Sequence, residues 1–375
     1  MIYLDYSATT PVNDDVLDTF NRVSKDFIGN PNSLHKLGSK SKELIDSATR
    51  QIADILGVKE SELIYTSGAS ESNNTIIKGI CLKYPNKKHI LTTYFEHSSI
   101  NSPLDYLRKE GYEIEYLNHI DGIIDLDDLK NKLRKDTCLV IVSAVNSEIG
   151  LLQPINDIGR VVKDYSNALF FSDITQLVGK KAFSLENVDL ASFSAHKFFG
   201  VKGIGGIVKR SNIDLIPLIM GGKSTTIYRS GTPSPALIAS MSKAIKIANQ
   251  NLDKYSQIEE LSNYLKKNIT FKDNIIVNSN DNCIPHIINV SVLGIKPETL
   301  LHSLEQHDIY ISTKTACSAD DDKSIPVYKL TNNEEKALSS IRISISYLTT
   351  KGEIDTLLKC LEDDVNKLLS FQSQV

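Results

Sequence analysis

The stretch that decides the fold is Leu190-Ala191-Ser192-Phe193-Ser194-Ala195-His196-Lys197, in which an apolar run ends in small and polar residues. The first half is typical of a buried strand, and the second half is typical of the loop that follows one. A second apolar run, Ala168–Phe171, precedes it and leads to Asp173. Two such strands predict a parallel sheet with a ligand site at the carboxyl ends of its strands.

Outward from this stretch, predicted strands and helices alternate over most of the chain. Helices are indicated by apolar residues recurring about every 3.6 residues, and strands by short apolar runs between Gly, Pro and polar residues. The predicted strands are 63–66, 89–93, 113–117, 138–142, 168–171, 190–193 and 206–209, and the predicted helices around them are 39–56, 72–82, 100–109, 126–133 and 154–165. The alternation predicts right-handed βαβ units, and therefore an α/β fold with a mostly parallel sheet covered on both faces.

A long helical stretch from about Ser234 to Lys266 interrupts the alternation of strands and helices, and we expect a domain boundary inside it. Residues 1–250 are predicted to form a large domain, with the segment 1–15 as a candidate for packing on the second domain. Residues 251–375 are predicted to form a smaller α/β domain with strands 287–292, 309–312 and 341–345 and helices 297–306 and 354–369. Between its strands, the polar stretch Thr313–Ser324 is predicted to be an exposed, mobile loop.

Composition narrows the function classes. The chain has 375 residues, 41% of them hydrophobic and 23% charged, which excludes disordered, collagen-like and coiled-coil proteins. Its 42 Lys and Arg and 46 Asp and Glu residues are interspersed and give a net charge of −4, so nothing indicates binding to nucleic acid or to a membrane surface. No apolar stretch approaches the roughly 20 residues of a membrane span, and no signal peptide follows Met1. We expect a cytoplasmic protein that acts on small molecules.

The five cysteines are an odd number, widely spaced and without a CxxC pair, which fits neither a disulfide framework nor a structural zinc site. Four of them, Cys81, Cys138, Cys283 and Cys360, lie in or near predicted elements and are interpreted as packing residues. Cys317 lies in the polar loop, where an exposed thiol could react. Reactivity requires the thiolate, and only Lys314 nearby would lower the pKa of this thiol, so an unreactive cysteine remains the alternative.

Three loops of the predicted sheet carry candidate site residues. Thr66–Asn74 follows a strand and opens a helix, so its small residues predict a phosphate site, although an ordinary capped turn is the alternative. Asp173 and Lys197 end two strands of the same sheet. A lysine beside a phosphate site, with a carboxylate for a protonated pyridine nitrogen, is the arrangement that pyridoxal phosphate (PLP) enzymes use. Taken alone, Lys197 would be interpreted as a surface lysine.

Two further residues are candidates for contact with a cofactor or a substrate. His97 follows the strand 89–93 and could stack on a flat ring and move protons, although a single histidine is more often structural. Arg342 lies inside a predicted strand, where it is either exposed at an edge or paired. A guanidinium is suited to bidentate binding of a carboxylate, and an amino-acid substrate would supply one.

Together these segments resemble the cysteine desulfurases, PLP enzymes of the class V aminotransferase group. The resemblance spans nearly the whole chain, and its collinear motifs are Tyr3–Pro11, Gly29–Pro31, Thr66–Asn74, Glu96-His97, Val145–Gly150, Asp173–Gln176, Ser194–Gly205, Arg229–Thr232, Ala316–Ser318 and Ser339–Ser344. It implies a type I PLP fold and a homodimer with active sites near the subunit interface. The loop around Cys317 resembles the longer-loop branch, which hands sulfur to several partners.

The resemblance also implies a role for each site residue. Lys197 would bind the cofactor aldehyde as a Schiff base, Asp173 would face the pyridine nitrogen, and His97 would stack on the ring. Cys317 would accept sulfur from L-cysteine as a persulfide, releasing L-alanine. The remaining expected contacts are Gln176 and Ser147 near the ring oxygen, Ala69, Ser70, Ser194 and His196 around the phosphate with Thr232 from the partner subunit, and Arg342 and Asn30 at the substrate.

Departures from the family pattern leave alternatives open. Ser147 stands where the family usually has asparagine, and residues 221–229 lack a Gln/His-Glu pair that is common after the two glycines. Ser70 replaces threonine but keeps the hydroxyl, and Val201 replaces proline. The expected sulfur acceptors are an iron–sulfur scaffold or a tRNA-thiolating enzyme. The alternatives are a selenocysteine lyase or aminotransferase of the same fold, or a partner-binding scaffold with low activity.

Overall fold

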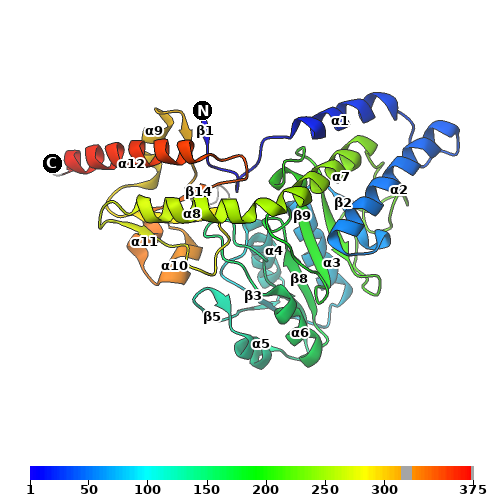
Figure 1. Ribbon diagram of the computed structural model, residues 1–375. Coiled ribbons are helices and arrows are strands. Elements are labelled where there is room, and N and C mark those ends of the chain that lie inside the picture. The colour runs from blue at the N-terminus through cyan, green and yellow to red at the C-terminus, as the bar shows by residue number, and fades with distance from the viewer. Residues whose placement is uncertain (314–322, 373–375) are drawn as a thin grey trace.

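The computed structural model describes residues 1–313 and 323–372, and its centre is a seven-stranded sheet (Figure 1). In spatial order the strands are β2 (Leu63–Thr66), β10 (Gly205–Lys209), β9 (Leu190–Ser194), β8 (Leu169–Asp173), β7 (Thr137–Ile141), β3 (His89–Thr92) and β4 (Glu113–Tyr116). Neighbours are parallel except at β10, which is antiparallel to both β2 and β9. The predicted α/β fold with a mostly parallel sheet is confirmed.

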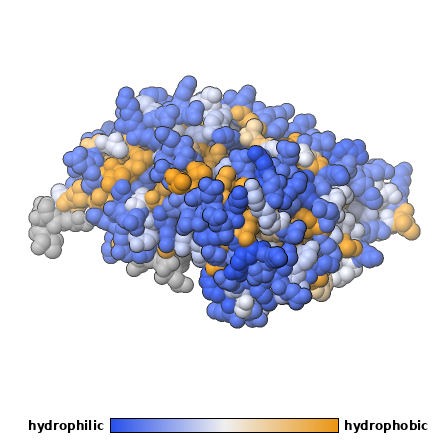
Figure 2. All heavy atoms as spheres, turned by 90° about the horizontal axis from the view of Figure 1, so that it is seen from below, coloured by the Kyte–Doolittle hydropathy of each residue, from blue (hydrophilic) through white to orange (hydrophobic). Residues whose placement is uncertain are grey.

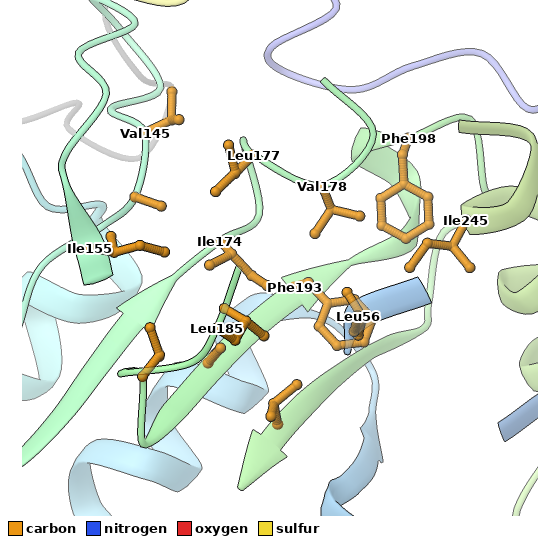
Figure 3. Close-up of a cluster of buried hydrophobic side chains, with 14 of the residues drawn as sticks. Leu56, Val145, Ile155, Ile174, Leu177, Val178, Leu185, Phe193, Phe198 and Ile245 are labelled. Carbon is orange, nitrogen blue, oxygen red and sulfur yellow. The ribbon is translucent and has the colours of Figure 1, made fainter. Parts of the chain in front are cut away.

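Helices cover both faces of this sheet because successive strand residues point to opposite sides. Phe170 packs into one apolar cluster and Phe171 into the other. The first cluster includes residues of α1 (Asp14–Asp26), α2 (Lys36–Leu56), α5 (Leu126–Lys132), α6 (Ile155–Tyr165) and α7 (Pro235–Gln250), and the second includes residues of α3 (Ala69–Lys83) and α4 (Ser98–Lys109). Figure 3 shows the first cluster, with Phe193 of β9 beside Leu56 of α2.

The predicted helix 234–266 is in fact two helices. A short 3-10 turn, η3 (Asn251–Lys254), separates α7 from α8 (Tyr255–Ile269). Beyond it, β11 (Ile275–Val277), β12 (Ile287–Val292) and β14 (Ser340–Ser344) form an antiparallel sheet that packs with α8, α9 (Pro297–Glu305) and α12 (Lys351–Gln372) around a separate apolar cluster. Figure 1 places this part at the opposite end of the molecule from α1 and α2. A domain boundary near residue 250 stays a prediction.

The N-terminal residues belong spatially with the C-terminal part. Strand β1 (Ile2–Tyr3) pairs in parallel with β13 (Ile309–Tyr310), and Leu4 lies in the same apolar cluster as β12 and β14. From there the chain crosses to the large sheet, where Thr10 Oγ1 donates to the backbone oxygen of His196 at 2.9 Å. The first ten residues therefore bridge the two parts of the molecule.

Several short elements were not predicted, because they are too short to show a periodic pattern. They are the strands β1 (Ile2–Tyr3) and β11, the 3-10 turns η1 (Glu60–Glu62), η2 (Ala195–Lys197) and η3, the hairpin β5 (His119–Ile120) and β6 (Ile123–Ile124), and the helices α10 (Ile325–Thr331) and α11 (Glu334–Leu338). Most of the predicted loop 313–324, with Cys317, lies outside the described residues. Within the described part, no helix is long and apolar enough to span a membrane. The face shown in Figure 2 is mostly hydrophilic, with apolar patches between.

Candidate active site

A cavity of about 610 Å³ opens at the carboxyl ends of the parallel strands. The loops after β2, β3, β7, β8 and β9 line one side of it, and the N-terminal segment and β14 close the other side. The predicted site residues that line it are Ala69, Ser70, His97, Ser147, Asp173, Gln176, Ser194, His196, Lys197 and Arg342. Residues that are far apart in the sequence thus meet at the edge of the sheet where a ligand site was expected.

The N-terminus of α3 faces this cavity and carries no side-chain cap. Gly68 occupies the N-cap position, and Ala69 and Ser70 follow it along the cavity wall. A Cβ added at Gly205 would lie 2.7 Å from Gly68 Cα, so Gly205 does not accommodate a larger side chain, and Gly68 has φ +154°, a conformation that favours glycine. Exposed N–H groups at a helix N-terminus attract anions, and the hydroxyls of Ser70 and Ser194 add donors. This arrangement fits a phosphate group.

His196 lies beside this helix terminus as a neutral ring. Its Nδ1 is 3.0 Å from Thr9 Oγ1, and its backbone oxygen accepts from the Thr10 hydroxyl. Burial, with Lys197 and other lysines nearby, lowers the pKa of His196 to about 4. At neutral pH the ring can therefore donate or accept a hydrogen bond without adding charge to the site.

Asp173 ends β8 as a buried carboxylate. Its Oδ2 accepts from Asn73 Nδ2 at 2.9 Å, and its Oδ1 accepts from the Thr175 amide at 2.9 Å. No cationic side chain in residues 1–313 or 323–372 lies within ion-pair distance of it. A buried carboxylate is stabilised by a cationic partner, so Asp173 is suited to a protonated nitrogen of a ligand.

His97 is the N-cap of α4 and lines the cavity. Its Nδ1 accepts from the Ser99 amide at 3.1 Å and lies 2.8 Å from Ser99 Oγ. Because Nδ1 accepts this backbone bond, the neutral ring carries its proton on Nε2. Burial lowers the pKa of His97, which favours that neutral form. Ser99 Oγ also accepts from Asn73, so a chain of hydrogen bonds joins His97 to Asp173.

Lys197 lies in η2, directly after β9, and its amine points to the N-terminal segment. Its Nζ donates to the backbone oxygens of Ser7 at 2.7 Å and Ala8 at 2.6 Å. Gln176 reaches the same segment, because its Nε2 donates to Ser7 O at 2.8 Å. The N-terminal segment therefore forms a wall of the cavity and contacts the amine that sequence reasoning selected as the reactive one.

Arg342 is only 2% exposed, and its guanidinium joins three segments of the chain. Its NH2 group pairs with Asp5 Oδ1 at 2.8 Å, and its NH1 group donates to the backbone oxygen of Ser147 at 3.0 Å. Its Nε has no hydrogen-bond partner among the described residues. The contact with Ser147 is made by a backbone carbonyl, so the replacement of asparagine by serine there leaves it in place.

Two predicted residues do not line this cavity, and a third lies outside the described residues. Asn30 is exposed after α1, where its Oδ1 accepts from the Asn32 amide at 2.9 Å. Thr232 is also exposed and is absent from the cavity lining of its own chain. Cys317 lies outside the described residues. The roles of all three stay predictions.

Burial supports the interpretation of the other four cysteines as packing residues. Cys81 and Cys138 are buried, and Cys283 and Cys360 are partly buried. Burial raises the pKa of the Cys283 thiol to about 11 and that of the Cys360 thiol above its ordinary value. Thiols with raised pKa values are poor nucleophiles.

Sequence reasoning missed the polar residues that hold these groups in place. They are Asp5, Ser7, Asn73 and Ser99. Each lay inside or next to a recognised motif, but no role follows from the motif alone. The sequence carries no signal for Asn73, because the burial that requires its amide to have partners is seen only in the folded chain.

Glu96 is a second buried carboxylate behind the cavity wall. It accepts hydrogen bonds from Thr93 Oγ1 at 2.6 Å and from the amide and hydroxyl of Ser143. Burial raises the pKa of Glu96 to about 7. Ser143 lines the cavity in the loop after β7. Its hydrogen bonds to Glu96 therefore hold this loop in place from the side away from the cavity.

Residues 2–357 match the pattern of the family described as aminotransferase class-V. The chain belongs to this family. Among its relatives, "Cysteine desulfurase IscS" of Dictyoglomus turgidum is 36% identical over 375 residues, which cover 98% of this chain and 95% of the relative. "Cysteine desulfurase, mitochondrial" of Saccharomyces cerevisiae is 38% identical over 98% of this chain and 75% of its own length.

Solved structures agree with this membership. A "NIFS-LIKE PROTEIN" superposes with a TM-score of 0.91 at 33% identity and covers 99% of both chains. "SspA in complex with cysteine" superposes with a TM-score of 0.81 at 30% identity, covering 92% of this chain and 99% of the other. The expected family and fold are therefore confirmed.

Membership of this family implies PLP as the cofactor. The residues present fit it, because the cavity combines a bare helix N-terminus for a phosphate, a lysine amine for an aldehyde and a carboxylate for a pyridinium nitrogen. The fit rests on the chemistry of these donors and acceptors.

Proposed function

We propose that this protein is a PLP-dependent cysteine desulfurase that converts L-cysteine to L-alanine and moves the sulfur to Cys317 as a persulfide. One observation carries the proposal: Lys197, Asp173 and Arg342 converge on one cavity. They supply an amine, a carboxylate and a guanidinium, the three groups that a PLP enzyme acting on an amino acid needs. The relatives named cysteine desulfurase, 36–38% identical over nearly the whole chain, support this substrate and reaction.

Each part of the cofactor has a matching group in the cavity. The α3 terminus, Ser70 and Ser194 would hold the phosphate. Asp173 would hold a proton on the pyridine nitrogen, and His97 would cover the ring. When bound, PLP supplies the electron sink that makes the Cα–H and Cβ–S bonds of the substrate cleavable.

The protein residues then perform the proton and sulfur transfers. Arg342 would bind the substrate carboxylate, and Lys197 would take the Cα proton. The Cys317 thiolate attacks the substrate sulfur, so an S–S bond forms while the Cβ–S bond breaks. The electron pair of the broken bond remains on Cβ, which takes up a proton, and the released product is alanine.

The persulfide sulfur would pass to an acceptor protein, either an iron–sulfur scaffold or a tRNA-thiolating enzyme. We propose the cytoplasm as the compartment, because all four described cysteines are free thiols and the cytoplasm keeps thiols reduced. The acceptor could be identified by capture of partners on the persulfidated protein.

We also propose that the protein is a homodimer. Two segments, 28–37 and 218–227, expose large apolar side chains, and a hydrogen bond from Asn32 Nδ2 to Ser224 Oγ at 3.1 Å joins them. These side chains are Ile28, Leu34, Leu37, Leu218, Ile219, Met220 and Ile227. Exposed apolar side chains on two joined segments favour a protein interface. Thr232 lies near the second segment in the sequence and would contribute to the cofactor phosphate in the partner subunit.

Sedimentation of two matched variants tests the dimer. Met220→Glu should shift the protein to a monomer and weaken PLP binding. Leu82→Glu changes an apolar residue that is 64% exposed on α3 and should leave the dimer intact. A dimer that survives Met220→Glu together with Leu34→Glu would contradict this surface.

The function itself is tested by incubating the PLP-loaded protein with L-cysteine and a thiol reductant. We expect alanine and sulfide in equal amounts, and loss of the persulfide in Cys317→Ala. Turnover that survives this substitution would favour a selenocysteine lyase or an aminotransferase. Normal PLP binding without turnover would favour a partner-binding scaffold.

A further inference from the structure

Lys180 is a buried lysine below the cavity that the proposed reaction does not use. It is 7% exposed and is the last residue of the turn 175–180, which follows β8 and Ile174. Ile174 and the turn residues Leu177 and Val178 lie in the same apolar cluster as Phe193 (Figure 3). Gly179 has φ +74°, and a Cβ there would lie 2.7 Å from Ala248 Cβ, so the turn packs tightly on α7. The backbone around Lys180 is therefore firmly held.

Among the described residues, the amine of Lys180 has two hydrogen-bond partners, both of which are oxygens of site residues. Its Nζ donates to Gln176 Oε1 at 3.0 Å and lies 3.5 Å from the backbone oxygen of Lys197. No carboxylate within the described residues pairs with it. Burying an isolated cation costs free energy. The hydrogen bonds to these two oxygens are therefore the contacts that stabilise the charge of Lys180.

Lys180 determines which way the Gln176 amide points. An ammonium group donates hydrogen bonds and cannot accept one, so it must face the amide oxygen rather than the amide nitrogen. The nitrogen of Gln176 is then left to face Ser7, whose carbonyl accepts at 2.8 Å and whose hydroxyl lies at 3.2 Å. The same Ser7 carbonyl accepts from Lys197 Nζ at 2.7 Å. One chain of hydrogen bonds thus runs from Lys180 through Gln176 and Ser7 to Lys197.

The charge of Lys180 acts on Lys197 as well. The titratable groups that face Lys180 are Lys197 and His196 of η2 and His286 before β12, and all of them are bases. Burial and the charge of Lys197 lower the pKa of Lys180 to about 7. Repulsion between two like charges is mutual, so a protonated Lys180 favours the unprotonated form of Lys197.

We propose that Lys180 is a positioning residue, which orients the Gln176 amide toward the cofactor site and favours the uncharged form of Lys197. The inference rests on the proposed PLP site but not on the identity of the substrate. It predicts a defined effect on cofactor binding and on the protonation of the cofactor–lysine linkage, both of which can be measured without turnover.

The test compares Lys180→Met with Lys181→Met, a neighbouring lysine whose Nζ lies 5.6 Å from the ring centroid of Tyr255, away from the cavity. Equilibrium titration of the apoprotein with PLP gives the dissociation constant, and absorbance of the bound cofactor against pH gives its titration midpoint. We expect Lys180→Met to weaken PLP binding about 3- to 10-fold and to raise the midpoint by about 0.5–1 pH unit. Lys181→Met should change neither.

A double-mutant cycle with Gln176→Leu tests whether Lys180 acts through the amide. The two effects on the PLP dissociation constant should be strongly non-additive, so that the double variant binds about as weakly as Gln176→Leu alone. Lys180→Arg retains a permanent charge and a donor, and its absorbance midpoint should not exceed that of the wild type. If Lys180→Met does not fold, the midpoint of Lys180→Arg still tests whether the charge of Lys180 affects the protonation of the cofactor–lysine linkage.

Additive effects in the cycle, or a Lys180→Met protein that matches Lys181→Met in both measurements, would overturn the proposal. A midpoint in Lys180→Arg above the wild-type value would also overturn it. A wild-type protein that binds PLP but makes no alanine would overturn the proposed function alone, because the comparison of Lys180 and Lys181 would still be decided by cofactor binding.

Discussion

The two sides of the cavity are assembled in different ways. On the sheet side, Asp173 ends β8, and Lys197 and His97 lie in the segments that follow β9 and β3, so their positions are set by elements of the same sheet. On the opposite side, Asp5 pairs with Arg342 across 337 residues of sequence. The sheet side is therefore fixed by local structure, and the other side by the packing of remote segments. We expect the first to govern cofactor chemistry and the second to govern substrate binding.

The largest effect is expected on the sheet side, from Lys197→Ala. Loss of the group that binds the aldehyde and moves the Cα proton should lower kcat for alanine formation by roughly 1000-fold or more. The measurement is single-turnover alanine formation by protein reconstituted with PLP. A control variant at a lysine that does not line the cavity, Lys181→Ala, keeps the amine of Lys197 and should retain most activity. Near-normal turnover by Lys197→Ala would contradict the expectation that the sheet side governs the cofactor chemistry.

On the opposite side, Arg342→Ala should act on the substrate. Losing a charge-assisted contact with the substrate carboxylate should reduce kcat/KM for cysteine about 100-fold, mainly through KM. The dissociation constant for PLP should stay within about 2-fold of the wild type, because Arg342 has no hydrogen bond to Asp173, Lys197 or His97 and reaches the sheet side through the Ser147 backbone oxygen. A large loss of PLP affinity would show that the two sides cannot be separated.

Glu96 provides a test of stability on the sheet side. Its pKa is raised to about 7 in the folded protein, so the folded state holds the proton more tightly than the unfolded chain. Its contribution to stability is therefore fully present below about pH 4.5 and is lost as the pH rises through about 7, at most about 3 kcal/mol in all. Chemical denaturation from pH 4.5 to 8 should show this decline, and it should be reduced in Glu96→Gln. A Glu96→Gln protein with the wild-type pH dependence would contradict this assignment.

The smallest effect is expected from Asp5→Asn. The amide keeps a hydrogen bond to Arg342 but removes the charge that neutralises the guanidinium, so the substrate carboxylate should bind more tightly and KM for cysteine should fall about 2- to 5-fold. Steady-state kinetics measures this, with kcat expected to change little. A raised KM would mean that the Asp5 charge orients Arg342 rather than competing with the substrate.

The same contrast explains what could be predicted from sequence. Every strand of the large sheet was located to within about two residues, because apolar runs and helical periodicity are local signals. Asp173, Lys197 and His97 were recognised because they follow such strands. The partners of these residues were not, since the contacts of Asp5, Ser7 and Asn73 depend on segments brought together only by folding. Lys180 gave no signal either, because its burial cannot be seen in the adjacent pair Lys180-Lys181.

The pairing of β1 with β13 has a consequence for synthesis. Strand β1 leaves the ribosome long before its partners do, because its partner strand ends at Tyr310 and the guanidinium partner of Asp5 follows at Arg342. The βα units of the large sheet have mostly local connections and can form while the chain is still growing. Completion of the cavity therefore waits until Arg342 has been made. A nascent chain that stops before Arg342 would carry the cofactor-binding side without the side that binds the substrate.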